Sequence, residues 1–125
     1  MSLPITRAPT IVLVDDDAAL RMALTFSLEL DGFEVVAFSS AEDMMDSLLP
    51  APPSCLVLDH NLTGITGLEA LRRLRARAVD LPALLMTSHP PTHLREAAGA
   101  LGATVVEKPL FGDTLATQVH AALAR

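Results

Sequence analysis

Aromatic residues and cysteine are scarce in this sequence. It contains no Trp or Tyr, four Phe and a single cysteine, Cys55. The core therefore has to be aliphatic, and an internal disulfide is excluded, so Cys55 is expected to be a small buried residue in a reducing compartment. No apolar run approaches the roughly 18 residues of a membrane span and no signal peptide is visible, which predicts a cytoplasmic protein without membrane contact.

Basic residues are also in the minority. Nine Lys and Arg face fifteen Asp and Glu, for a net charge of −6. A nucleic-acid partner is disfavoured, because neutralisation of phosphates is the main source of such affinity. The length of 125 residues predicts one domain. Residues 1–9 contain Pro4 and Pro9 and no periodicity, so we expect a flexible N-terminal tail followed by a single domain over residues 10–125.

Short apolar runs alternate with helical periodicities along the rest of the chain. The runs are too continuous for strands with one solvated face, and they predict buried parallel strands at residues 11–14, 35–38, 55–58, 83–86 and 104–106. Apolar residues at helical spacing follow each run, around residues 20–28, 44–48, 68–74, 94–101 and 115–123. Five such units predict an α/β fold, a doubly wound parallel five-stranded sheet, with the common strand order 2-1-3-4-5.

Local signals support these boundaries. A hydroxyl residue lies three positions before an acid at Ser39 and Glu42 and again at Thr66 and Glu69, which predicts two capping boxes at helix starts. Glycines follow the first and fourth helical periodicities at Gly32 and Gly102, and a cluster of prolines at residues 50–53 follows the second.

Polar residues that can bind a ligand or take part in a reaction follow four of the five predicted strands. They are Asp15, Asp16 and Asp17 after the first, Asp59 after the third, Thr87 and Ser88 after the fourth, and Lys108 after the fifth. The carboxyl ends of parallel strands meet at one edge of the sheet, where ligands bind at the switch point between strands 1 and 3. We expect Asp17 to cap the first helix and the other residues to share a site.

The chemistry of this set favours phosphoryl transfer. Crowded carboxylates repel one another unless a cation shares the site, and hard oxygen ligands with open positions suit Mg²⁺. Lys108 is the only lysine in the chain. A metal ion, an ammonium group and a hydroxyl group together neutralise the oxygens of a phosphoryl group during transfer to a carboxylate nucleophile. The expected product is an aspartyl phosphate.

The same residues form four motifs in a specific order: 14–17 (VDDD), 58–62 (LDHNL) with Gly64 and Gly67, 86–88 (MTS) and 107–109 (EKP). In these motifs the sequence resembles the receiver domain of two-component response regulators, from residue 11 to about 123. The resemblance implies a flavodoxin-like (βα)₅ fold and a phosphoprotein that acts in phosphorelay signal transduction, not an enzyme beyond its own phosphotransfer and dephosphorylation.

The resemblance also implies a role for each site residue. Asp59 accepts a phosphoryl group from the phosphohistidine of a sensor histidine kinase or phosphotransfer protein. Asp16, Asp59 and the backbone carbonyl of Asn61 bind Mg²⁺, with Asp15 acting through a metal-bound water. Thr87 and Lys108 hold the phosphoryl oxygens, and the peptide bond between Lys108 and Pro109 is cis.

Two positions depart from the family pattern. Thr63 stands where proline is usual, which predicts a less rigid loop after Asp59. Val105 stands where receivers generally carry Tyr or Phe, a ring that turns inward when the domain is phosphorylated. The chemistry of phosphorylation is therefore expected to be intact, while the usual way of reporting it is missing.

With no output segment visible in the sequence, we expect a single-domain response regulator that signals through a downstream protein partner or acts as a phosphate sink. It is expected to be a monomer or a weak homodimer. The alternative is a small Mg²⁺-dependent aspartyl-phosphate phosphatase resembling the haloacid dehalogenase superfamily. That family needs a second Asp two residues after the nucleophile, where this chain has Asn61. A third alternative, a flavin-binding flavodoxin, is disfavoured by the lack of Trp and Tyr.

Overall fold

A computed structural model describes residues 8–108 and 114–124. Within these residues, five parallel strands form one sheet in the order β2-β1-β3-β4-β5, which confirms the predicted doubly wound fold. The strands are β1 (Thr10–Val14), β2 (Glu34–Phe38), β3 (Ser54–Asp59), β4 (Ala83–Thr87) and β5 (Ala103–Glu107). The helices are α1 (Ala18–Leu30), α2 (Ala41–Met45), α3 (Gly67–Ala76), α4 (Leu94–Ala100) and α5 (Thr114–Leu123).

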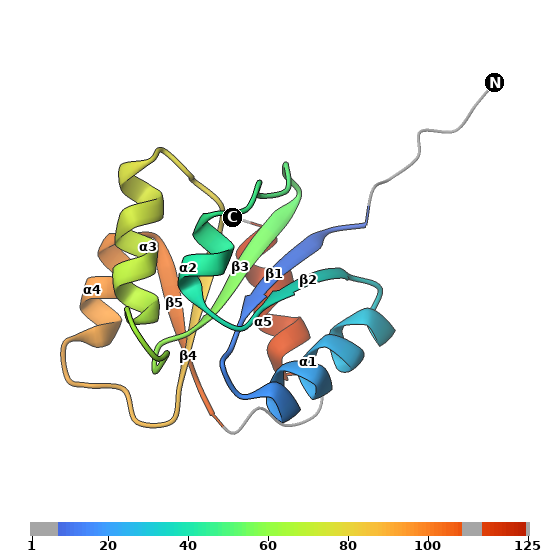
Figure 1. The fold of residues 1–125 in the computed structure, drawn as a ribbon, viewed down its shortest axis with the longest axis horizontal. Helices are drawn as coiled ribbons and strands as arrows, with labels where there is room; N and C mark the ends of the chain where they lie inside the picture. Colours follow the sequence, from blue (N-terminus) through green and yellow to red (C-terminus); the bar gives the residue numbers. More distant parts are fainter. Residues whose placement is uncertain (1–7, 109–113, 125) are drawn as a thin grey trace.

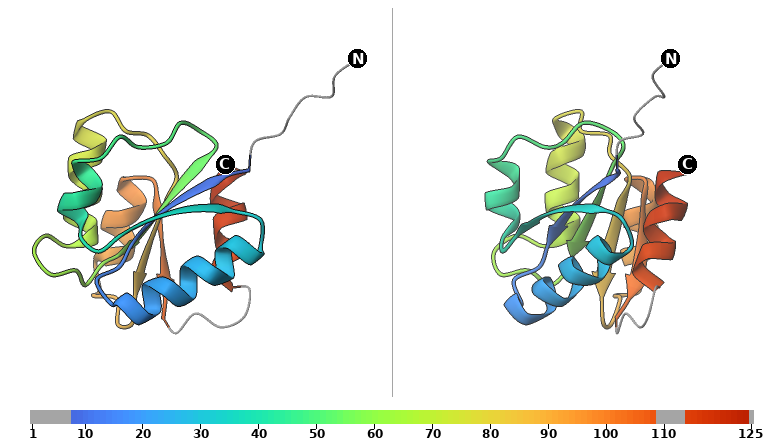
Figure 2. Two further views of the ribbon diagram at one scale, coloured as in Figure 1. Left: turned by 45° about the vertical axis from the view of Figure 1, so that its right-hand side comes forward. Right: turned by 90° about the vertical axis from the view of Figure 1, so that its right-hand side faces the viewer.

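The helices form a layer on each face of the sheet (Figures 1 and 2). Alternate residues of the central strands point to opposite faces, so each strand contributes to two cores. One core lies under α2, α3 and α4 and includes Val12, Leu56 and Leu85. The other lies under α1 and α5 and includes Ile11, Val57 and Met86. Burial on both faces explains why β1, β3 and β4 read as continuous apolar runs.

The edge strand and the second helix differ from the sequence-based expectations. The prediction that every strand is covered on both faces is wrong for β2, in which no residue is fully buried and Val36 is 43% exposed. β2 is an edge strand with one neighbouring strand, and the helix that follows it, α2, has only five residues. The apolar periodicity through Leu48 does not continue the helix, because α2 ends at Met45 and Leu48 is 99% exposed.

Side-chain caps begin three of the helices. As predicted, Asp17 caps α1 by accepting a hydrogen bond from Leu20 N at 3.1 Å, and Thr66 caps α3 by accepting one from Glu69 N at 3.1 Å. The predicted cap of α2 is off by one residue, because Ser40 and not Ser39 accepts from the backbone N of Asp43. Both serines precede an acid at the same spacing, so the sequence alone does not separate them.

Among residues 8–108 and 114–124, no helix has both the length and the apolar character needed to cross a bilayer.

Two further expectations concern the ends of the described chain. β1 begins at Thr10, where the sequence predicts that the domain starts. Most of the predicted tail and the peptide bond between Lys108 and Pro109 lie outside the described residues.

Cys55 lies in β3 with no exposed surface, and burial raises the pKa of its thiol to about 12. The thiolate is the reactive form of cysteine, so the native protein is expected to react with a thiol reagent only through global unfolding. The measurement is the rate of labelling by a chromogenic disulfide reagent, without denaturant and in guanidinium chloride. Rapid labelling of the native protein would contradict this burial.

Candidate functional site

The carboxyl ends of four strands bring the predicted residues to one edge of the sheet. Asp15 directly follows β1, Asp59 ends β3, Thr87 ends β4 and Lys108 directly follows β5. The parallel registers align these ends, with Val14 paired to Leu58, Asp59 paired to Met86 and Thr87 paired to Glu107. Residues separated by up to 93 positions in sequence (108 − 15) therefore meet at the switch point of the sheet.

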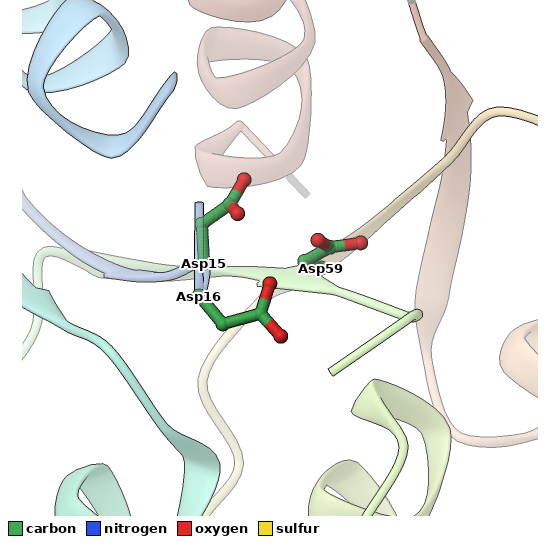
Figure 3. A group of neighbouring side chains, drawn as sticks. All are labelled: Asp15, Asp16 and Asp59. Atoms are coloured by element: carbon green, nitrogen blue, oxygen red, sulfur yellow. The ribbon is translucent and has the colours of Figure 1, made fainter. Parts of the chain in front are cut away.

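Three carboxylates form the centre of the site (Figure 3). Asp15, Asp16 and Asp59 each offer an oxygen, and these oxygens lie within 4.8 Å of one another. The side chains of Asp15 and Asp59 are buried, whereas Asp16 is exposed on the rim. In Figure 3 one carboxylate oxygen of Asp16 points toward the other two acids, and the second points away from them.

The ammonium group of Lys108 balances part of this charge. Its Nζ lies 3.2 Å from Asp59 Oδ2 and 3.8 Å from Asp15 Oδ2. The Lys108 side chain is 18% exposed, so the pairs are shielded from water better than surface salt bridges are. The chain's only lysine is thus placed against the acid that ends β3, as the sequence predicted.

Asp15 lacks a full set of partners. Its Oδ1 accepts a hydrogen bond from Asp17 N at 2.9 Å, but its buried Oδ2 has no hydrogen-bond partner among the described residues. Burial raises the pKa of Asp15 above its usual value, and Asp59 and Asp16 raise it further, while the Asp17 N–H and Lys108 oppose the shift. A buried acceptor with an unused lone pair, next to two more carboxylates, fits a small divalent cation with oxygen ligands such as Mg²⁺.

Thr87 and Asn61 lie on the other side of Asp59. The backbone N of Asn61 donates to Asp59 Oδ1 at 3.1 Å, and its side-chain Nδ2 donates to Thr87 Oγ1 at 3.2 Å. Thr87 has no exposed surface. The hydroxyl group at the end of β4 is therefore fixed toward the loop that follows Asp59, where it can reach a group bound to that carboxylate.

The residues after Asp59 approach α3 very closely at Gly67. Its backbone N donates to His60 O at 3.1 Å, and a Cβ at this position would lie 2.5 Å from the backbone O of Asp59. Only a residue without a side chain fits this contact without displacement of the backbone. Gly67 thus fixes the main chain that carries Asp59.

One contact of the site was not predicted. Thr63, at which the sequence predicted only a less rigid loop, donates from its backbone N and from its Oγ1 to the same atom, Asp16 Oδ2, at 3.0 Å each. The partners are 47 positions apart. No local sequence pattern relates two loops at this separation, so this contact is visible only in the tertiary structure.

Comparison with known proteins identifies the class. The family model described as the response regulator receiver domain matches residues 11–120. The transcriptional regulatory protein FixJ of Bradyrhizobium diazoefficiens is 37% identical over 114 residues, which cover 90% of this chain and 56% of that protein. A crystal structure of full-length FixJ from B. japonicum, at 36% identity, matches with a TM-score of 0.82 over 92% of this chain and 57% of that chain.

A third match shows the fold alone. Chemotaxis protein CheY4 of Vibrio cholerae is 22% identical and superposes with a TM-score of 0.84 over 93% of this chain and 99% of that chain.

The chain belongs to the receiver-domain family of two-component response regulators. Membership implies a phosphoacceptor aspartate and a signalling role. The chain spans about half the length of the FixJ proteins that it matches.

Proposed function

We propose that Asp59 is the phosphoryl acceptor of this receiver domain and that a sensor histidine kinase or a phosphotransfer protein supplies the phosphoryl group. The observation that carries the proposal is the set of charges around the Asp59 carboxylate: Lys108 Nζ lies 3.2 Å from its Oδ2, and oxygens of Asp15 and Asp16 lie within 4.8 Å. A lysine and a candidate cation site next to one carboxylate suit an acceptor of a highly charged group.

In this proposal Asp15, Asp16 and Asp59 hold Mg²⁺ together with the carbonyl of Asn61. The buried Oδ2 of Asp15, which has no hydrogen-bond partner among the described residues, and the clustered oxygens support this choice of ligands. When bound, the ion neutralises negative charge on the acceptor and on the incoming phosphoryl group. The other steps of the transfer are carried out by side chains of the protein.

The transfer forms one bond and breaks another. An oxygen of the Asp59 carboxylate forms a P–O bond as the P–N bond of the phosphohistidine breaks, and the imidazole leaves with its electron pair and takes up a proton. Lys108 then pairs with a phosphoryl oxygen, and the Thr87 hydroxyl donates to another. Thr87 is already buried and bonded to Asn61, so this donor needs little rearrangement.

Readout of the phosphorylated state is proposed to involve a protein contact that does not use a ring at position 105. Val105 is 7% exposed and belongs to the core under α4. Arg95 of α4 bonds to Val105 O at 3.4 Å and pairs with Glu107, the residue before Lys108. These contacts connect α4 to the end of β5, and Lys108, whose side chain extends into the site, directly follows β5.

The dehalogenase-like phosphatase is not favoured. The residue two positions after Asp59 is Asn61, whose side chain donates to Thr87 and offers no carboxylic acid for a leaving group. Steady turnover of a phosphate monoester such as p-nitrophenyl phosphate would revive that alternative.

The test is phosphorylation by acetyl phosphate, followed by intact-protein mass spectrometry. We expect the wild-type chain to gain one phosphoryl group in Mg²⁺ and none in EDTA, and Asp59→Asn to gain none. Asp43→Asn, at an exposed acid of α2, is the matched control and is expected to label like the wild type. An Asp59→Asn protein that still labels, or Mg²⁺-independent labelling of the wild type, would refute the assignment.

A further inference from the structure

The contact between Thr63 and Asp16 joins the two loops that flank the switch point. Asp16 lies between β1 and α1, and Thr63 lies between β3 and α3. Both donors of Thr63 meet the same oxygen, Asp16 Oδ2, at 3.0 Å. Figure 3 shows one Asp16 oxygen directed toward Asp15 and Asp59 and the other directed away.

The position of Asp16, an exposed aspartate beside two other carboxylates, is electrostatically unfavourable without a fixed partner. Asp15 and Asp59 repel it, and water competes for its oxygens, since Asp16 is exposed while its two neighbours are buried. Without a fixed partner its side chain would swing into solvent and would have to be ordered again on binding of a cation. Hydrogen bonds to an ionised oxygen are the stronger and more directional kind, and two of them converge here.

We propose that Thr63 is a positioning residue of the cation site: its N–H and hydroxyl group hold Asp16 by Oδ2, so that the Asp16 carboxylate is kept next to Asp15 and Asp59 before Mg²⁺ binds. The inference rests on the proposed function, in which Asp16 is a ligand. Thr63 acts through Asp16 and touches neither the ion nor the phosphoryl group. Partners of this kind orient a ligand and thereby raise affinity.

Three substitutions separate the two donors. Thr63→Ser keeps the N–H and the hydroxyl group, Thr63→Val keeps only the N–H, and Thr63→Pro removes both, because proline has no backbone N–H. Thr117→Val, at an exposed threonine of α5, is the matched control for loss of a surface hydroxyl group.

The measurement is the Mg²⁺ dissociation constant by isothermal titration calorimetry at fixed ionic strength, with the melting temperature in EDTA recorded for each protein. We expect Thr63→Ser and Thr117→Val to match the wild type, Thr63→Val to bind about threefold more weakly, and Thr63→Pro about tenfold more weakly, at the lower end of the effects of such partners.

Two results would overturn the inference. Equal affinity of all variants would show that Thr63 only shapes the loop, and tighter binding by Thr63→Val or Thr63→Pro would show that Thr63 competes with the ion. If Thr63→Pro fails to fold, the comparison of Thr63→Val with Thr63→Ser decides. Failure of the wild-type chain to bind Mg²⁺ at all would instead overturn the proposed function, and this inference with it.

Discussion

Replacement of Gly67 with alanine is expected to destabilise the domain by about 2–3 kcal/mol, in the upper part of the range of about 1–3 kcal/mol that is typical of overpacked sites. The added Cβ would lie 2.5 Å from Asp59 O and 3.0 Å from His60 Cα. Both neighbours are backbone atoms and cannot rotate away. The contact is relieved only if α3 or the loop carrying Asp59 moves.

The helical propensity of alanine works in the opposite direction, which makes the sign of this effect informative. Alanine stabilises a helix by about 0.5–1 kcal/mol relative to glycine, so an unobstructed helical site would gain stability. At Gly67 the contact with the backbone outweighs this gain. For a domain of this size about 1 kcal/mol corresponds to about 4 °C, so the melting temperature is expected to fall by roughly 8–12 °C.

The matched control is Gly99→Ala in α4. A Cβ at Gly99 would meet no atom within 4 Å, so this variant is expected to be slightly more stable than the wild type. Thermal and urea unfolding of the three proteins measure both effects, and labelling by acetyl phosphate reports whether Asp59 has been displaced. Equal stability of Gly67→Ala and Gly99→Ala would contradict the tight packing of α3 on the Asp59 backbone.

Substitution of Asp15 with asparagine is expected to raise the stability of the metal-free domain by about 1–2 kcal/mol and to weaken Mg²⁺ binding, since an unsatisfied buried group costs about this much. The change removes one of three crowded negative charges and a buried carboxylate oxygen, Oδ2, that has no hydrogen-bond partner among the described residues, and the amide oxygen can still accept from Asp17 N. A residue retained at a cost to stability is characteristic of a functional site.

The two effects are separated by unfolding with and without Mg²⁺. At about one hundred times its dissociation constant, Mg²⁺ is expected to stabilise the wild-type domain by roughly 2.7 kcal/mol, and the same concentration is expected to stabilise Asp15→Asn much less. Asp17→Asn is the control, because Asp17 caps α1 and asparagine caps a helix equally well. A less stable Asp15→Asn protein in EDTA would contradict the picture of a strained acid.

The pH dependence of this difference has a definite sign. Burial raises the pKa of Asp15, so the native domain takes up the proton at a higher pH than the unfolded chain does. The ionised form therefore costs stability at neutral pH, and this cost fades as the pH falls through the raised native pKa toward the ordinary carboxyl value of 3.8. The stability gain of Asp15→Asn in EDTA is expected to shrink over the same pH range.

The FixJ relatives are named as transcriptional regulators, and each is longer than the segment matched here. Their length concerns the whole proteins, whereas the chemistry proposed for Asp59 needs only the receiver domain. For this chain the absence of a nucleic-acid partner, the monomeric or weakly dimeric state and the cytoplasmic location stay predictions.

Several features of the protein follow from the sequence alone, because they depend on local pattern. Continuous apolar runs gave β1, β3 and β4, since strands buried on both faces need apolar residues throughout. Asp17 and Thr66 marked helix starts through their short-range caps. The site followed once the fold was known, because the ends of parallel strands must share one edge and Asp15, Asp59, Thr87 and Lys108 stand at those ends.

Other features were decided only by the tertiary structure, because they depend on what lies beside a residue in space. The apolar pattern of β2 is the same whether a strand is central or at the edge, and its exposure goes with its position at the edge of the sheet. The lack of a hydrogen bond to the buried Oδ2 of Asp15, the contact of Gly67 with Asp59 and the two hydrogen bonds of Thr63 depend on burial or on how loops and helices pack. The sequence shows which acids are present. Packing determines that Asp16 is hydrogen-bonded by Thr63, that the three carboxylates lie close together and that Asp15 Oδ2 accepts no hydrogen bond from the described residues.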